Sequence, residues 1–276
     1  LLKMDFLGLR NLSIVDRTLE LIGSESLDID NLKLDDEKTF KLFAEGKMTG
    51  VFQLESRVAQ STSRSLKPKR FEDIVALVAL IRPGPLGAGM HNEFADRANN
   101  RKEIEYLHND LESILNETYG VILYQEQVMQ IAEKIAGFNL QEADNLRVAM
   151  GKKIPKVMEE QRKKFTDGAV SNNYSEQFAI ELFDQIAYFA GYGFNKSHSV
   201  PYALLAYQTA YLKANYPAEY IAACLTAVKR DKDRTAIFLS EARDMGVKVS
   251  TPDINLSSSD FTVNDNEILF GLSAVR

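Results

Sequence analysis

Residues 189–202 read FAGYGFNKSHSVPY and connect two apolar segments that have helical spacing. Gly191 and Gly193 loosen the backbone where the first segment ends. We predict that Ser199 caps the next helix and that Pro201 lies in its first turn. Unpaired N–H groups and the helix dipole favour negative charge at such a terminus, so the polar side chains beside it indicate an anion site. A capped loop with solvent-facing side chains fits the same pattern equally well.

Helical periodicity continues on both sides of this loop and through most of the chain. Helices are predicted over residues 9–22, 71–81, 124–136, 140–150, 175–190, 200–214 and about 234–245, with another from Asp35 or Asp36 to Gly46 and a further one after Pro217. Glycines such as Gly23, Gly46 and Gly137 end several of them. Residues 247–249, 261–263 and 268–271 alternate like short strands. The sequence therefore predicts a mainly α fold with a small β element near the C-terminus.

Composition limits the class of protein. The chain has 276 residues and 45% apolar residues, enough for one large domain or two. The single Cys224 excludes an intramolecular disulfide and suits a reducing compartment. The longest apolar run, residues 74–81, is too short to span a bilayer, so we predict a cytoplasmic protein without membrane contact. With a net charge of −6, binding to nucleic acid would depend on local basic patches.

Residues 1–7 alternate like a buried strand that has no neighbours ahead of it, so we interpret the chain as part of a longer one. Asp5 stands at the centre of this strand, where an isolated carboxylate is costly to bury. A bound metal ion or a facing cationic side chain would compensate the charge of this carboxylate. Lys3 lies on the same strand face and could be that partner, or Asp5 could face solvent.

Two basic features favour a phosphate ligand. Arg82 precedes Pro83, which pushes it out of the helical region and holds its guanidinium on a stiff corner. Residues 147–164 contain seven basic residues and two acids, and Arg147 and Lys152 flank a predicted turn there. A rigid interhelical corner and a solvated helix face are the alternative interpretations.

Five motifs occur in order: residues 3–10 (KMDFLGLR), 50–56 (GVFQLES), 82–86 (RPGPL), 149–153 (AMGKK) and 192–199 (YGFNKSHS). Together they resemble the C family of bacterial replicative polymerases, the alpha subunits of DNA polymerase III. The resemblance extends over essentially the whole chain, through PDIN at residues 252–255. It implies the last palm strand over residues 1–10, a multi-helix fingers domain over 11–230, and a helix with short strands over 231–276.

The resemblance also implies a catalytic role for Asp5. In this family three palm aspartates bind two Mg²⁺ ions, and Asp5 matches the third of them. Lys3 would lie near the triphosphate. The other two aspartates would precede Leu1, so the fragment by itself should not polymerise.

In the same family the fingers hold the incoming nucleotide. Arg82, Arg147 and Lys152 would contact phosphate, although Val148 stands where many members have a second arginine. Tyr192 and His198 match residues around the base and sugar, and His198 would exclude a 2′-hydroxyl by its bulk. The two residues that would support this loop are Asn195 and Lys196.

By resemblance the partners are primer–template DNA, deoxynucleoside triphosphates (dNTPs), a sliding clamp, a clamp loader and a proofreading exonuclease. The competing hypothesis is a non-catalytic helical nucleic-acid-binding or scaffold module, in which Asp5 pairs with Lys3. The combination of Asp5 with the His198 loop favours the polymerase, because a scaffold requires neither.

Overall fold

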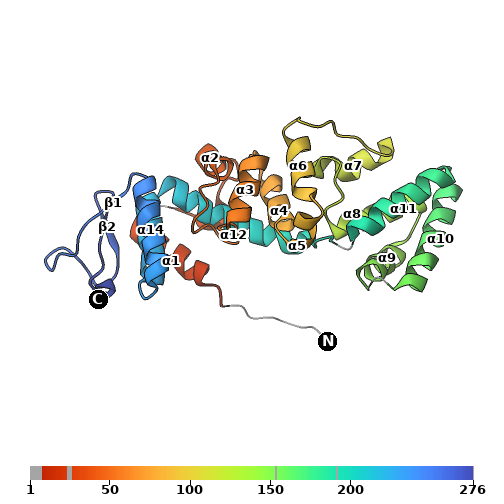
Figure 1. The fold of residues 1–276 in the computed structure, drawn as a ribbon. Coiled ribbons are helices and arrows are strands. Elements are labelled where there is room, and N and C mark those ends of the chain that lie inside the picture. Colours follow the sequence, from red (N-terminus) through yellow and green to blue (C-terminus); the bar gives the residue numbers. More distant parts are fainter. Residues whose placement is uncertain (1–7, 24–26, 153, 191, 276) are drawn as a thin grey trace. The chain divides into compact units, whose positions relative to one another are not determined.

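The computed structural model describes residues 8–23, 27–152, 154–190 and 192–275, which are mainly helical (Figure 1). The predicted strand over residues 1–7, with Lys3 and Asp5, lies outside this part. The chain divides into two compact units, unit 1 (Leu1–Gln60 and Leu204–Arg276) and unit 2 (Ser61–Ala203). The mainly α fold class is confirmed, whereas the predicted domain boundaries stay predictions.

Unit 1 packs helices from both ends of the sequence around one core. Its elements are α1 (Arg10–Ile22), η1 (Ile29–Asn31), α2 (Glu37–Glu45), α13 (Pro217–Val228), α14 (Lys232–Asp244), three strands and η4 (Leu272–Ala274). The buried side chains of α1, α13 and α14 share a cluster with Phe261 and Ile268. Cys224 lies in this cluster and is fully buried, as its apolar surroundings in the sequence indicated.

The predicted β element is a three-stranded sheet in unit 1. β1 (Lys248–Val249) runs parallel to β3 (Glu267–Leu269), and β2 (Thr262–Asn264) pairs antiparallel with β3. The turn from β2 to β3 holds two residues with positive φ, Asp265 at 47° and Asn266 at 62°. Asp and Asn tolerate this conformation, which two-residue hairpin turns require.

Unit 2 contains the helices that carry most of the predicted site. They are α4 (Phe71–Leu80), α5 (Pro83–Gly87), α6 (Met90–Ala98), η2 (Asn109–Leu111), α7 (Glu112–Leu115), η3 (Asn116–Thr118), α8 (Gln125–Ala136), α9 (Leu140–Lys152), α10 (Pro155–Ser171) and α11 (Glu176–Ala190). Buried residues of α8 to α11 form one core cluster. A Cβ at Gly168 of α10 would lie 2.2 Å from the Ala136 carbonyl oxygen, so glycine permits the close approach of α10 to α8. The division between the units falls within α3 (Arg57–Leu66) and α12 (Lys196–Asn215).

The predicted start of α12 was wrong. The helix begins at Lys196, and Pro201 lies inside it instead of in its first turn. Asn195 acts as the cap, because its side-chain oxygen accepts a hydrogen bond of 2.8 Å from the His198 backbone N–H. Ser199 is buried, and its hydroxyl donates to the Val75 carbonyl at 2.7 Å. The cap is displaced because this tertiary contact uses the Ser199 side chain.

Within the described ranges, no helix has the length and apolar character that crossing a bilayer requires.

Candidate functional site

The loop between α11 and α12 is fixed to the start of α8 by backbone pairing. The Phe194 N–H donates to the Leu123 carbonyl at 3.1 Å, and the Gln125 N–H donates to the Phe194 carbonyl at 2.9 Å. The Gln125 side-chain amide also donates to the Gly193 carbonyl at 3.3 Å. Residues about 70 positions apart in the sequence therefore form one local platform.

Arg82 reaches this platform from the corner between α4 and α5. Its backbone is extended, with φ −143° and ψ 153°, as the following proline predicts. Its guanidinium donates to the Ala79 carbonyl at 3.1 Å and to the Tyr192 carbonyl at 2.6 Å, and lies 4.2 Å from the centre of the Phe194 ring. These contacts hold the planar group in a fixed orientation.

Arg82 is a half-buried cation, and none of the carboxylates among the described residues forms an ion pair with it. Burial lowers the pKa of its guanidinium from the ordinary value. Of the five N–H donors of an arginine, two are used by the two carbonyls, which leaves three without a partner among the described residues. An anion at this corner would compensate the charge and accept these donors.

Tyr192 packs its ring against the backbone of α5. A Cβ added to Gly84 would lie 2.4 Å from the Tyr192 Cδ1 atom, so any larger residue at position 84 must displace the ring. The Tyr188 ring approaches Tyr192 edge-on, with 6.3 Å between the ring centres. Gly84 thus determines where Tyr192 can lie.

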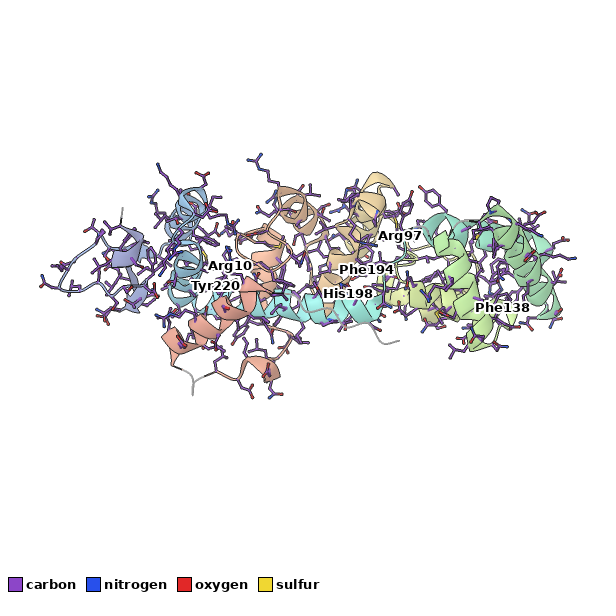
Figure 2. The ribbon with its side chains drawn as sticks, turned by 90° about the horizontal axis from the view of Figure 1, so that it is seen from below. Arg10, Arg97, Phe138, Phe194, His198 and Tyr220 are labelled. Carbon is purple, nitrogen blue, oxygen red and sulfur yellow. The ribbon has the colours of Figure 1, made fainter. Side chains whose placement is uncertain are left out.

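His198 is exposed and lies in the first turn of α12. Its ring stacks on Tyr202, with 4.4 Å between the centres and 28° between the planes, and meets the Phe194 ring edge-on at 5.4 Å. His198 and Phe194 are labelled in Figure 2. Asn195 holds the backbone of this turn through the bond to the His198 N–H. The imidazole is consequently both oriented and accessible.

Lys196 is held by two carboxylates. Its ammonium donates to Glu117 at 2.7 Å, and its backbone N–H lies 3.0 Å from each carboxylate oxygen of Glu126. The Glu117 pair is about one-third exposed, with 36% and 30% of the two side chains accessible, so it contributes about 1 kcal/mol or less and can exchange partners. The carboxylate of Glu126 occupies the N-terminus of α12, where the sequence predicted an anion.

Arg147 on α9 pairs with Asp144, with Nε and Nη2 at 2.9 and 2.8 Å from the same carboxylate oxygen. Its Nη1 also lies 3.4 Å from the side-chain oxygen of Gln125, which links it to the loop platform. Lys152 is the last residue of α9, and its side chain lies outside the described part of the chain.

Six of the predicted site residues therefore gather around one loop of unit 2. They are Arg82, Arg147, Tyr192, Asn195, Lys196 and His198. Their proposed contacts with a nucleotide stay predictions, as do those of Lys3, Asp5 and Lys152.

In the described ranges, no three side chains of His, Cys, Asp or Glu cluster closely enough to hold a metal ion. The magnesium site predicted at Asp5 lies outside these ranges, and the described residues supply no alternative to it.

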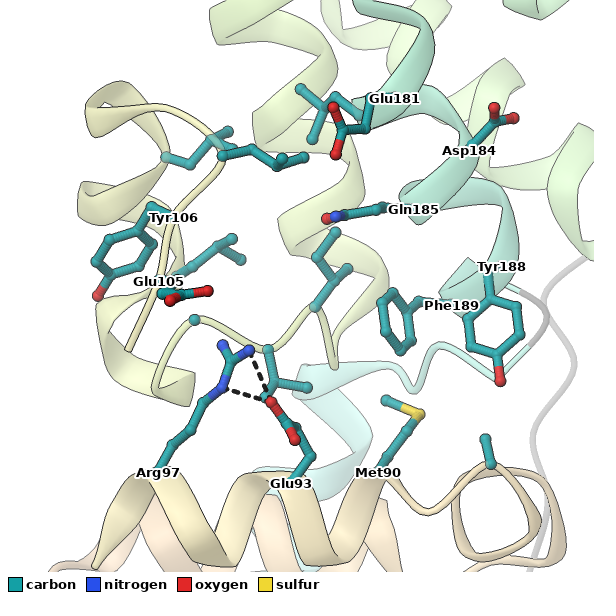
Figure 3. A pocket seen from close by; sticks show the side chains of 18 of the residues that line it. Met90, Glu93, Arg97, Glu105, Tyr106, Glu181, Asp184, Gln185, Tyr188 and Phe189 are labelled. Carbon is teal, nitrogen blue, oxygen red and sulfur yellow. Dashed lines mark hydrogen bonds and ion pairs between the residues drawn. The ribbon is translucent and has the colours of Figure 1, made fainter. Parts of the chain in front are cut away.

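A cavity of about 1070 Å³ lies elsewhere in unit 2, between α6 and α11 (Figure 3). Its lining contains five carboxylates and one cation, Arg97, which pairs with Glu93 at 2.8 Å. None of the predicted site residues lines it. Because its charge is predominantly negative, it does not suit a triphosphate, and we do not assign the nucleotide to it.

Several residues of the platform were missed by sequence reasoning. Gln125, Glu126 and Phe194 make the contacts described above, and Glu117 and Gly84 support Lys196 and Tyr192. A glycine between two prolines was a usable local signal for Gly84. No local signal marks the others, because their partners are distant in sequence.

The family model for the bacterial DNA polymerase III alpha subunit finger domain matches residues 11–173, and a helix-hairpin-helix motif model matches residues 246–276. The DNA polymerase III subunit alpha of Saccharopolyspora erythraea is 50% identical over 283 residues, and that of Mycobacterium tuberculosis is 47% identical over 283 residues. The protein of the same name from Escherichia coli is 47% identical over 289 residues.

Each alignment covers 100% of this chain and 24% or 25% of the relative, so the chain spans about a quarter of the length of these relatives. The residues matched to the helix-hairpin-helix motif form the three strands and η4, and no α-helix among those described. The finger-domain model covers more than half of the 276 residues, and the resemblance noted in the sequence is confirmed: the chain belongs to the bacterial DNA polymerase III alpha subunit family, and its residues 11–173 match the finger domain.

Proposed function

We propose that residues 1–276 are part of a template-directed DNA polymerase and that unit 2 binds the incoming dNTP. The observation that carries this proposal is Arg82, a half-buried guanidinium without a carboxylate partner among the described residues. A cation in this state is costly unless a ligand supplies negative charge. The relatives named DNA polymerase III subunit alpha support the reaction class.

The phosphates would lie against the basic side of the loop. Arg82 offers three donors, and Arg147, Lys152 and Lys196 would add charge. Arg147 and Lys196 are paired with Asp144 and Glu117 in pairs that are at least 30% exposed, so a triphosphate can replace these carboxylates at small cost. Catalysis of phosphoryl transfer consists mainly of such positioning and charge neutralisation.

The base and sugar would lie against the aromatic side of the loop. Tyr192 is held by Gly84, and His198 is oriented by its stacking on Tyr202. A ring packed against the sugar leaves no room for a 2′-hydroxyl, which gives a steric basis for selecting deoxynucleotides. Asn195 would contribute by fixing the turn that carries His198.

Asp5 would bind catalytic Mg²⁺, two ions in the complete site, and Lys3 would lie near the triphosphate. When bound, the metal stabilises the charge of an in-line displacement. Both residues lie outside the described ranges, so this part rests on the resemblance alone. Asp5→Asn removes a ligand charge and keeps the shape, so primer extension should collapse in the full-length protein while DNA binding persists. Unchanged extension would exclude Asp5 as a ligand.

The proposed partners are primer–template DNA, a sliding clamp, a clamp loader and a proofreading exonuclease, in the cytoplasm. They are inferred from the family. Residues 1–276 alone are not expected to polymerise, because the family places further metal-binding aspartates elsewhere in the palm.

The sharpest test concerns Arg82. Arg82→Ala should lower kcat/KM for a correct dNTP by about 10- to 150-fold in the full-length protein, because one charge-assisted hydrogen bond contributes about 1.5–3 kcal/mol. Arg82→Lys should recover little, since an ammonium cannot both lie flat on Phe194 and donate to the Tyr192 carbonyl. Arg101→Ala is the matched control, because Arg101 is exposed and pairs with Asp96.

A loss at Arg82 no larger than that at Arg101 would contradict the proposal. It would show that Arg82 does not contact the incoming dNTP. The non-catalytic nucleic-acid-binding or scaffold module would be favoured only if the parent itself extended no primer. Measuring DNA binding of each variant separates the two functions, because only the module needs Arg82 for DNA alone.

A further inference from the structure

We propose that Glu126 is a positioning residue that sets how strictly His198 excludes ribonucleotides, an inference that rests on the function proposed above. Glu126 is the second residue of α8 and carries no role in the predicted site. Its carboxylate is directed at the first residue of α12, the helix whose first turn presents His198.

The contact satisfies a backbone group that the helix itself cannot satisfy. The first four N–H groups of a helix have no partner inside it, and that of Lys196 is the first. Both oxygens of Glu126 lie 3.0 Å from this nitrogen. A negative charge at this end is also favoured by the helix dipole. Glu126 therefore acts as a cap supplied by another helix.

The effect reaches His198 through two residues of backbone. The first turn of α12 has one internal cap, Asn195, which accepts from the His198 N–H at 2.8 Å. Asn195 moves with the turn, whereas Glu126 belongs to α8 and ties the turn to a separate element. Ser199, at the far end of the turn, is tied to Val75 of α4, and the Lys196 side chain pairs with Glu117. Without Glu126, the backbone of the turn loses its tie to α8, so its first residues can shift relative to Phe194, which is paired with Leu123 and Gln125.

A shift of this kind should relax selection against the sugar more than it weakens nucleotide binding. His198 makes no hydrogen bond through its ring that would fix it independently among the described residues, and its orientation depends on stacking with Tyr202 and on the edge contact with Phe194. Small displacements of the ring would admit a 2′-hydroxyl. The contacts of Arg82 with the Tyr192 carbonyl do not involve this turn.

The test measures kcat/KM for a dNTP and for the matching ribonucleoside triphosphate in the full-length protein. In Glu126→Ala, the ratio of the two values should fall about tenfold, as expected for the loss of a helix cap. Glu126→Asp should behave similarly, because its side chain is one methylene too short. Glu126→Gln keeps the acceptor and loses the charge, so the ratio should fall only about two- to threefold.

Glu133→Gln is the matched control. Glu133 lies seven residues further along α8, about two turns, and its carboxylate has no hydrogen bond or ion pair among the described residues. The ratio of kcat/KM for dNTP to that for the ribonucleotide should be the same in Glu133→Gln as in the parent. Thermal unfolding of every variant accompanies the kinetics, and the near-isosteric Glu126→Gln decides the outcome if Glu126→Ala does not fold.

Two results would overturn the proposal. If both triphosphates lose kcat/KM by the same factor, Glu126 supports the fold only. If Glu126→Gln lowers KM equally for both, the carboxylate competes with phosphate for the helix terminus instead of positioning His198. Two different results would contradict the proposed function itself. These are a parent protein that incorporates no nucleotide, and a His198→Ala variant whose ratio of kcat/KM for dNTP to that for the ribonucleotide is unchanged.

Discussion

Lys213 in unit 1 should be one of the most sensitive positions for stability. Its side chain is 1% exposed, and its ammonium donates to the Lys47 carbonyl at 2.7 Å, the Thr49 carbonyl at 2.9 Å and Glu241 at 2.6 Å. All three donors of the ammonium are therefore used. Burial lowers the pKa of Lys213, and the pairing with Glu241 opposes this shift. The group joins α12, α14 and the loop after α2.

Lys213→Met fills nearly the same volume and removes the charge. It leaves Glu241, 13% exposed, without its partner, and it leaves two carbonyl groups without donors. Breaking a buried pair from one side costs about 3–5 kcal/mol, and we expect a loss of about 4 kcal/mol in the free energy of unfolding of unit 1. The double variant with Glu241→Leu should lose less, about 2 kcal/mol, because no unpaired charge stays buried.

Hydrogen exchange read by mass spectrometry is the suitable assay, since it reports the two units separately. Peptides from α13 and α14 should exchange faster in Lys213→Met, and peptides from α8 to α11 should be unchanged. A loss below about 1 kcal/mol, or a double variant less stable than the single one, would refute the view that Lys213 is a buried, fully satisfied charge.

Two further predictions follow from single contacts. Gly84→Ala should raise KM for dNTPs several-fold and lower the free energy of unfolding by about 1–3 kcal/mol. The reason is that the new Cβ would lie 2.4 Å from Tyr192 Cδ1. Gly87→Ala, on the same helix, is the control and should behave as the parent, because its Cβ meets nothing within 4 Å. Burial would raise the pKa of Asp36, but hydrogen bonds from Thr39 and Asn215 outweigh this effect, so the net pKa lies below the ordinary value of an aspartate. The charge of Asp36 therefore stabilises α2 above about pH 4, by about 0.5 kcal/mol, and this advantage over Asp36→Asn should vanish in unfolding measurements as the pH falls through the folded pKa.

Helix boundaries were predictable where their signals are local. Gly23 and Gly46 follow α1 and α2 directly, and Asp36 caps α2 by accepting from the Thr39 N–H at 2.8 Å. Each of these interactions joins residues fewer than five positions apart, so residue type and spacing are sufficient to reveal them.

The start of α12 shows where local reasoning fails. Ser199 followed by a proline two residues later fits the rules for a helix start, but the helix begins four residues before its predicted start, where Asn195 and Glu126 provide the caps. Glu126 is 70 positions from Lys196, and Glu117 is 79 positions away. Sequence spacing carries no trace of such pairs, so the sequence predicted candidate side chains for the site but not their partners.

The hydrogen-bond and ion-pair partners of each cation determine how strongly that cation should attract a phosphate. Arg147 and Lys196 each have a carboxylate, so their charges are largely balanced before any ligand arrives. Among the described residues, the partners of Arg82 are two carbonyl groups and an aromatic face, neither of which carries a negative charge. If the site binds a triphosphate, Arg82 should therefore supply most of the initial attraction, and the other two cations should contribute by exchanging Asp144 and Glu117 for phosphate. Removing either acid should strengthen nucleotide binding, because the cation beside it no longer has a competing partner.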